Sequence, residues 1–116
     1  MNEKICTMLV QNRAVSYDDS LHGQAGALPC ERCGRWSHTL ERHHRQFRSR
    51  GGLWVPSNIL LLCSGCHSDA TDEAPWVAGS GVNVHSYEVP AEVRVNLWHC
   101  GWVLLDDEGG YQAAHY

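Results

Sequence analysis

The chain has 116 residues, a formal net charge of −4 at pH 7 and an ordinary hydrophobic content of 43%. This length suits one small domain, and this composition argues against global disorder. No apolar run approaches the roughly 18 to 20 residues of a membrane-spanning helix, and the net charge argues against nucleic-acid binding over the whole surface.

Residues 1–29 carry little periodic pattern, and we expect them to form a partly ordered N-terminal lead-in. They do not combine a basic start, an apolar run and a small-residue cleavage site, which together mark a secretory signal. The expected setting is therefore the cytoplasm, where disulfides are rare and paired cysteines more often bind a metal ion.

Two Cys-x-x-Cys pairs bracket the middle of the chain, Cys30 with Cys33 and Cys63 with Cys66. Four thiolates satisfy the tetrahedral preference of Zn²⁺ and leave no open coordination position, which is typical of a structural site. Such a site would supply folding free energy that a small chain can use. Disulfides are one alternative. A zinc ribbon without catalysis is another, and only the residues between the pairs can argue against it.

Residues 39–47 suit a short strand, followed by a loop at the Gly51-Gly52 pair. Because successive side chains of a strand point to opposite faces, the adjacent His43 and His44 would point apart. One histidine can then bind a metal ion while the other addresses a substrate, which is a physical reason for such a pair at a hydrolytic site.

The following residues predict a turn, an apolar segment and a helix in that order. Residues 56–58 are a turn signal, residues 59–62 are an apolar run, and a helix over 66–73 would have to stop before Pro75. The remainder of the chain contains short apolar segments separated by Gly, Pro and Asp, which predict short strands. These segments are residues 76–77, 82–84, 93–95 and 102–105.

The charges are segregated along the chain. Six of the nine Lys and Arg residues lie between positions 32 and 50, whereas eight acidic residues and a single basic one follow Cys66. This distribution is expected of a local phosphate-binding face on an acidic body. A solvated charged face is the alternative, and the interleaving of the arginines with candidate metal ligands favours a functional role.

The stretch from residue 30 to about residue 70 resembles the HNH endonucleases, which are ββα-metal nucleases. The resemblance rests on the two cysteine pairs, His43-His44-Arg45, Gly51-Gly52, the run Ser57–Cys63, and Cys66-His67. It implies a small α+β fold whose ββα-metal core, residues 30–74, is stapled by the structural four-cysteine zinc site. The lead-in 1–29 would precede this core, and a β-rich extension, 75–116, would pack on it.

The resemblance also implies roles for single residues. His44 resembles the general base that activates a water molecule, and Asn58 resembles the residue that holds the base or the metal loop in position. His43 and His67 look like ligands of a catalytic divalent ion, which could be Mg²⁺, Mn²⁺, Ni²⁺ or Zn²⁺. Many members have aspartate at the position of His43, and a histidine there favours the softer ions.

Four arginines of the basic segment would hold backbone phosphates of DNA, which positions a duplex without reading its sequence. The one nearest the site is also counted with His44 and Asn58 as catalytic, because it could contact the scissile phosphate. The four are Arg42, Arg45, Arg48 and Arg50, and Arg45 is the one nearest the site.

These features together predict a metal-dependent DNA endonuclease that nicks or cleaves with little sequence specificity. By analogy with small free-standing members, the setting would be the cytoplasm of a bacterial host. There it would serve phage DNA processing or packaging beside a terminase or another DNA-processing protein. A non-catalytic zinc-stabilised module that binds nucleic acid or protein is the alternative. The presence of His44, Asn58 and His67 favours the nuclease over this alternative, since a binding module does not need these three residues together.

Overall fold

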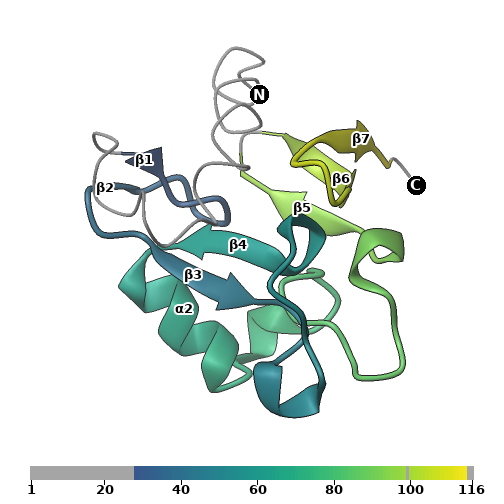
Figure 1. Cartoon of the computed structure of the whole chain (residues 1–116). Coiled ribbons are helices and arrows are strands. Elements are labelled where there is room, and N and C mark those ends of the chain that lie inside the picture. Colours follow the sequence, from purple (N-terminus) through teal and green to yellow (C-terminus); the bar gives the residue numbers. More distant parts are fainter. Residues whose placement is uncertain (1–27, 99, 115–116) are drawn as a thin grey trace.

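The computed structural model describes residues 28–98 and 100–114, so the lead-in expected at 1–29 lies almost wholly outside the described residues. The described residues form one α-helix and several antiparallel strands, which confirms the expected small α+β fold (Figure 1). The elements in chain order are β1 (Leu28–Pro29), β2 (Trp36–Ser37), β3 (Glu41–His44), β4 (Ile59–Leu62), α2 (Ser64–Thr71), β5 (Val95–Leu97), β6 (Gly101–Leu105) and β7 (Tyr111–Ala113).

The centre of the fold is the antiparallel pair β3–β4 followed directly by α2. His43 lies opposite Leu60 and His44 opposite Ile59 in the strand register. All four residues of β4 are buried, because α2 packs on the hairpin and the leucines also belong to the main apolar core. Figure 1 shows α2 on one side of this hairpin and the C-terminal sheet toward the other. The strand–strand–helix order therefore follows the prediction, although β3 ends at residue 44.

The loop between β3 and β4 contains two short 3-10 turns, Arg48–Arg50 and Pro56–Asn58. Gly51 ends the first turn with φ +88°, a left-handed conformation that favours glycine. Gly52 has a different constraint, since a Cβ atom there would lie 1.7 Å from the carbonyl oxygen of Gln46. The predicted glycine loop is thus folded back tightly against the end of β3.

The C-terminal part of the chain forms a three-stranded antiparallel sheet in the order β5-β6-β7. Val95, Leu97, Val103 and Leu105 from this sheet are buried in the same core as the leucines of β4. The strand expected at 76–77 is instead a 3-10 turn, Pro75–Val77, because proline at its first position fixes φ for a turn. Residues 82–84 and 93–94 are likewise outside the strands.

Backbone hydrogen bonds join this C-terminal part to the strand–strand–helix unit. The Val84 N–H donates to the carbonyl of Arg45 at 2.8 Å, and the Trp98 N–H donates to the carbonyl of Glu31 at 2.8 Å. The side chain of Gln46 also donates to the carbonyl of Glu88 at 3.0 Å. Residues on both sides of position 74 are therefore held in one arrangement around β3.

Within the described ranges, none of the helices is long and apolar enough to cross a membrane.

Candidate active site

The four cysteines predicted to bind a metal ion come together at one end of α2. Their sulfur atoms all lie within 4.8 Å of one another, and those of Cys33 and Cys63 are 3.7 Å apart. A zinc–sulfur distance of about 2.3 Å in a tetrahedron requires sulfur atoms about 3.8 Å apart. The donor set and its spacing therefore fit a four-coordinate ion.

The first cysteine pair sits in a tight knuckle. The N–H of Gly34 donates to the carbonyl of Cys30 at 2.9 Å, and Gly34 adopts φ +83°. A Cβ atom at this glycine would lie 2.3 Å from the ring of Trp98. Burial raises the pKa of the Cys30 and Cys66 thiols, so an ion that binds here would displace their protons.

His43 lies on the buried side of β3 with only 2% of its surface exposed. Its Nε2 atom is 3.2 Å from the carbonyl oxygen of Val82 and 2.8 Å from Oδ1 of Asn83. Burial lowers the pKa of His43 to about 4, and the hydrogen bond from the ring to Asn83 opposes this shift only in part. The ring is therefore neutral at pH 7, which is the form that can bind a metal ion.

His67 lies in the first half of α2, one residue after Cys66. The ring centroids of His43 and His67 are 5.3 Å apart in an edge-to-face arrangement. Nδ1 of His67 is 2.5 Å from Oε1 of Glu41, so a carboxylate on β3 orients this imidazole. The strand and the helix thus bring the two predicted metal ligands side by side.

His44 lies on the opposite face of β3 from the buried His43 and is partly exposed. Its ring is 5.0 Å from that of Trp54, centroid to centroid. Burial and the positive charge of Arg48 both lower the pKa of His44 from its ordinary value of 6.5. A larger fraction of this histidine is therefore neutral near pH 6 than in an isolated side chain, as a general base requires.

An open cleft of about 180 Å³ joins these groups. A cleft of this volume has room for a divalent ion and phosphate oxygens. Among the described residues, the cysteine cluster is the only group of three or more possible ligands, so the histidine pair leaves coordination positions open. The cleft is lined by Arg42, His43, His44, Phe47, Arg48, His67 and Thr71.

Residues 30–73 match the family model of the HNH endonucleases. This segment belongs to the HNH endonuclease family. The match covers less than half of the chain and includes the four cysteines, His43, His44, Asn58 and His67. No curated protein and no solved structure matches the chain.

Arg45 does not lie at the surface or in the cleft, where a DNA contact or a catalytic role would place it. It is fully buried, and its guanidinium donates to the carbonyls of Gly81, Ser57, Pro90 and Val93 at 2.7–3.0 Å. The expectation for this residue is corrected on that ground, since a guanidinium without exposed surface cannot reach a phosphate. Within the HNH domain, Arg45 fastens the end of β3 to the C-terminal part of the chain.

Asn58 is also fully buried and does not line the cleft. Its Oδ1 atom accepts from the N–H of Gln46 at 2.7 Å, and its amide donates to the carbonyls of Gln46 and Leu53. These bonds hold the loop that begins directly after the candidate base. Asn58 therefore holds this loop in place and does not itself reach the cleft.

The other three arginines are at the surface but do not form one patch. Arg42 and Arg48 line the cleft beside the histidines. Arg50 lines a neighbouring pocket and also lies over the ring of Phe47, 4.7 Å from its centroid. The cleft itself therefore presents two guanidinium groups.

Sequence reasoning missed two residues that contact the candidate ligands, Glu41 and Asn83. The position of Glu41 two residues before His43 places both on one strand face, so alternation could have indicated it. Asn83 had no such signal, because it lies 40 residues from His43 and outside the matched HNH segment.

Proposed function

We propose that this protein is a metal-dependent endonuclease that hydrolyses phosphodiester bonds of DNA. The observation that supports the proposal is the cleft lined by three imidazoles and two guanidinium groups, with His43 and His67 side by side and His44 separate from them. The HNH match supports the nuclease class and DNA as the substrate. Zn²⁺ in the cysteine cluster would close the scaffold, as its four-sulfur donor set favours.

The roles of the cleft residues follow from their positions. His43 and His67 would hold the divalent ion, which when bound would polarise a phosphoryl oxygen and stabilise the leaving 3′ oxygen. His44, on the opposite strand face from His43, would take a proton from the attacking water. A ligated nitrogen has no lone pair for a proton, so the separation of the two neighbours matters.

Arg42 and Arg48 would hold phosphates on either side of the scissile bond. Such contacts position a duplex without reading its bases, which supports cleavage with little sequence specificity. The resemblance to small free-standing HNH nucleases supports a role in phage DNA processing, with a terminase as a candidate partner.

The test is a plasmid-nicking assay with and without added Mg²⁺, Mn²⁺, Ni²⁺ or Zn²⁺. His44→Ala should reduce the nicking rate on the order of 10²-fold or more while the protein remains folded. His38→Ala is the matched control, because His38 is an exposed histidine outside the cleft. Equal nicking by the wild type and His44→Ala would remove the base assignment. Binding of DNA without any metal-dependent cleavage would favour the non-catalytic module.

A further inference from the structure

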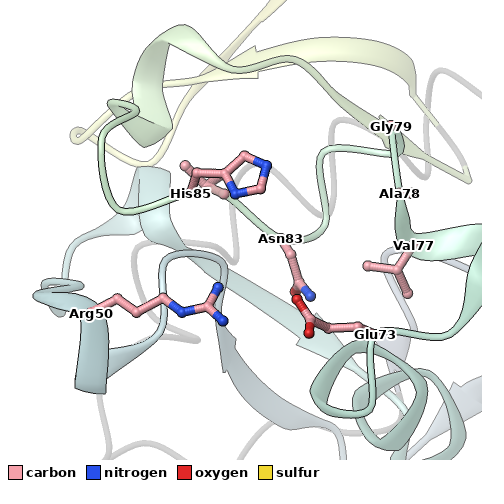
Figure 2. Close-up of a pocket in the computed structure, with 8 residues that line it drawn as sticks. Arg50, Glu73, Val77, Ala78, Gly79, Asn83 and His85 are labelled. Atoms are coloured by element: carbon pink, nitrogen blue, oxygen red, sulfur yellow. The ribbon is translucent and has the colours of Figure 1, made fainter.

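Asn83 lies where the C-terminal part of the chain meets both β3 and α2. It forms part of the wall of a pocket of about 200 Å³, and Figure 2 shows its side chain between His85 and Glu73. Its amide makes two bonds that span these elements. Oδ1 is 2.8 Å from Nε2 of His43, and Nδ2 donates to the carbonyl of Ala70 at 2.8 Å.

The hydrogen-bond partners define where each proton lies. The carbonyl oxygen of Val82 can only accept, so Nε2 of His43, 3.2 Å away, must carry the hydrogen. The carbonyl of Ala70 can likewise only accept, which assigns Nδ2 of Asn83 as the atom facing it. Oδ1 of Asn83 is then the atom that faces His43 and accepts from it.

A neutral imidazole carries one N–H group, so a ring protonated on Nε2 leaves its lone pair on Nδ1. The opposite tautomer would point the lone pair of Nε2 at two oxygen atoms, which is repulsive. Nδ1 of His43 makes no hydrogen bond within the described residues and is thus the nitrogen available to a metal ion. At His67 the carboxylate of Glu41 faces Nδ1, so Nε2 is the available nitrogen.

We propose that Asn83 is a positioning residue of the active site. It acts with the Val82 carbonyl to hold His43 in the Nε2–H tautomer, which leaves Nδ1 for the catalytic ion. This inference rests on the proposed function in so far as His43 is a ligand. The same amide holds the carbonyl of Ala70, three residues after His67 in α2. One side chain from outside the HNH segment therefore fixes the strand ligand and the helix that carries the other ligand.

Two substitutions separate the two bonds. Asn83→Asp keeps an oxygen acceptor for His43 but has no donor for the carbonyl of Ala70. Asn83→Leu has similar volume and makes neither bond. Asn96→Leu is the matched control, because Asn96 is a partly buried asparagine of β5 that does not line the cleft.

The first measurement is the tautomer of His43 from ¹⁵N chemical shifts of its ring. It is made on full-length protein with zinc in the cysteine cluster and no other divalent ion. The wild type, Asn83→Asp and Asn96→Leu should show the Nε2–H form. Asn83→Leu should show a mixture, because the 2.8 Å contact with Asn83 is lost and only the longer 3.2 Å contact with the Val82 carbonyl still favours Nε2–H. An Nδ1–H ring in the wild type, or a wild-type tautomer in Asn83→Leu, would overturn the inference.

The second measurement is the affinity for Mn²⁺ or Ni²⁺ by calorimetry. Loss of a partner that orients a metal-bound histidine typically costs 10- to 100-fold in affinity, so Asn83→Leu should bind that much more weakly. Asn83→Asp should stay within a few-fold of the wild type but melt at a lower temperature. If Asn83→Leu does not fold, a loss of the Nε2–H form in Asn83→Asp would still overturn the inference. The wild-type nicking assay tests the proposed function separately, because the tautomer is measured without catalysis.

Discussion

The cysteine cluster and the histidine cleft share the helix α2 but differ in every other respect. Cys66 belongs to the cluster, and the next residue, His67, lines the cleft. The cluster offers four sulfur atoms around one point, whereas the cleft offers two candidate imidazole ligands and a third imidazole in an open cavity. Saturating all four positions suits a scaffold, and leaving positions open suits chemistry. The comparison predicts that the cleft depends on the cluster, while the cluster does not depend on the cleft.

The largest expected effect comes from breaking the cluster. Cys63→Ser should abolish cooperative folding, because structural zinc sites supply about 10–16 kcal/mol, as much as the whole stability of a small domain. Thermal unfolding followed by circular dichroism, together with zinc content by mass spectrometry, checks this. A Cys63→Ser protein that melts like the wild type would show that the cluster is not structural.

The next largest effect should come from Arg45, which connects the matched segment to the C-terminal part of the chain. Arg45→Met should lower the free energy of unfolding by about 3 kcal/mol or more, because several buried carbonyls lose their donor. Arg42→Met is the control, since Arg42 lines the open cleft and should change stability little. Urea denaturation of both variants measures the difference. Equal stability of the two would contradict the buried role of Arg45.

Removal of a candidate ligand from the cleft should leave the cysteine cluster intact. His67→Ala removes a predicted ligand. Among the described residues, the side chain that loses its hydrogen-bond partner is Glu41, which is 45% exposed and can be solvated by water. Nicking should fall by more than the 10- to 100-fold that loss of a ligand's hydrogen-bond partner costs. The zinc content and melting temperature should stay near those of the wild type. A His67→Ala protein that loses its zinc would mean that the two sites are not separate.

The smallest predicted effect concerns pH. Burial and the charge of Arg48 lower the pKa of His44, so the base stays neutral to lower pH than a free histidine. Arg48→Ala removes one of these causes and should raise that pKa. The acid limb of the pH–rate profile should then move to higher pH, and the ratio of rates at pH 5.5 and pH 7.5 should fall. Arg50→Ala removes the same charge outside the cleft, and its acid limb should not move.

The sequence predicts well what depends on spacing along the chain. The two cysteine pairs indicate the metal cluster, since only a local knuckle is needed at each pair. The alternation at His43 and His44 indicates that the two side chains point to opposite faces, and the structure adds that His43 is buried and His44 only partly so. The apolar run of β4 indicates a buried strand.

Contacts between distant segments could not be predicted in the same way. Arg45 has the same chemical character as Arg48, and nothing in its sequence neighbourhood says that carbonyls from residues 81–93 surround it. The contacts of Asn83 could not be predicted from its sequence neighbourhood either, because they depend on a loop that packs between a strand and a helix. Pro75 shows a third limit, where a local backbone preference for a turn overrides an apolar pattern.

The buried guanidinium of Arg45 has a consequence for modularity. Among the described residues, four carbonyl groups accept from this guanidinium, and three of them lie beyond the segment that matches the HNH family: those of Gly81, Pro90 and Val93. A fragment that ends at residue 73 would therefore keep every residue of the recognised motif. The same holds if that fragment is inserted into another protein. It would also carry a charged side chain with most of its partners removed. In this protein, recombination at the family boundary would separate the motif from the carbonyl groups that surround its buried arginine.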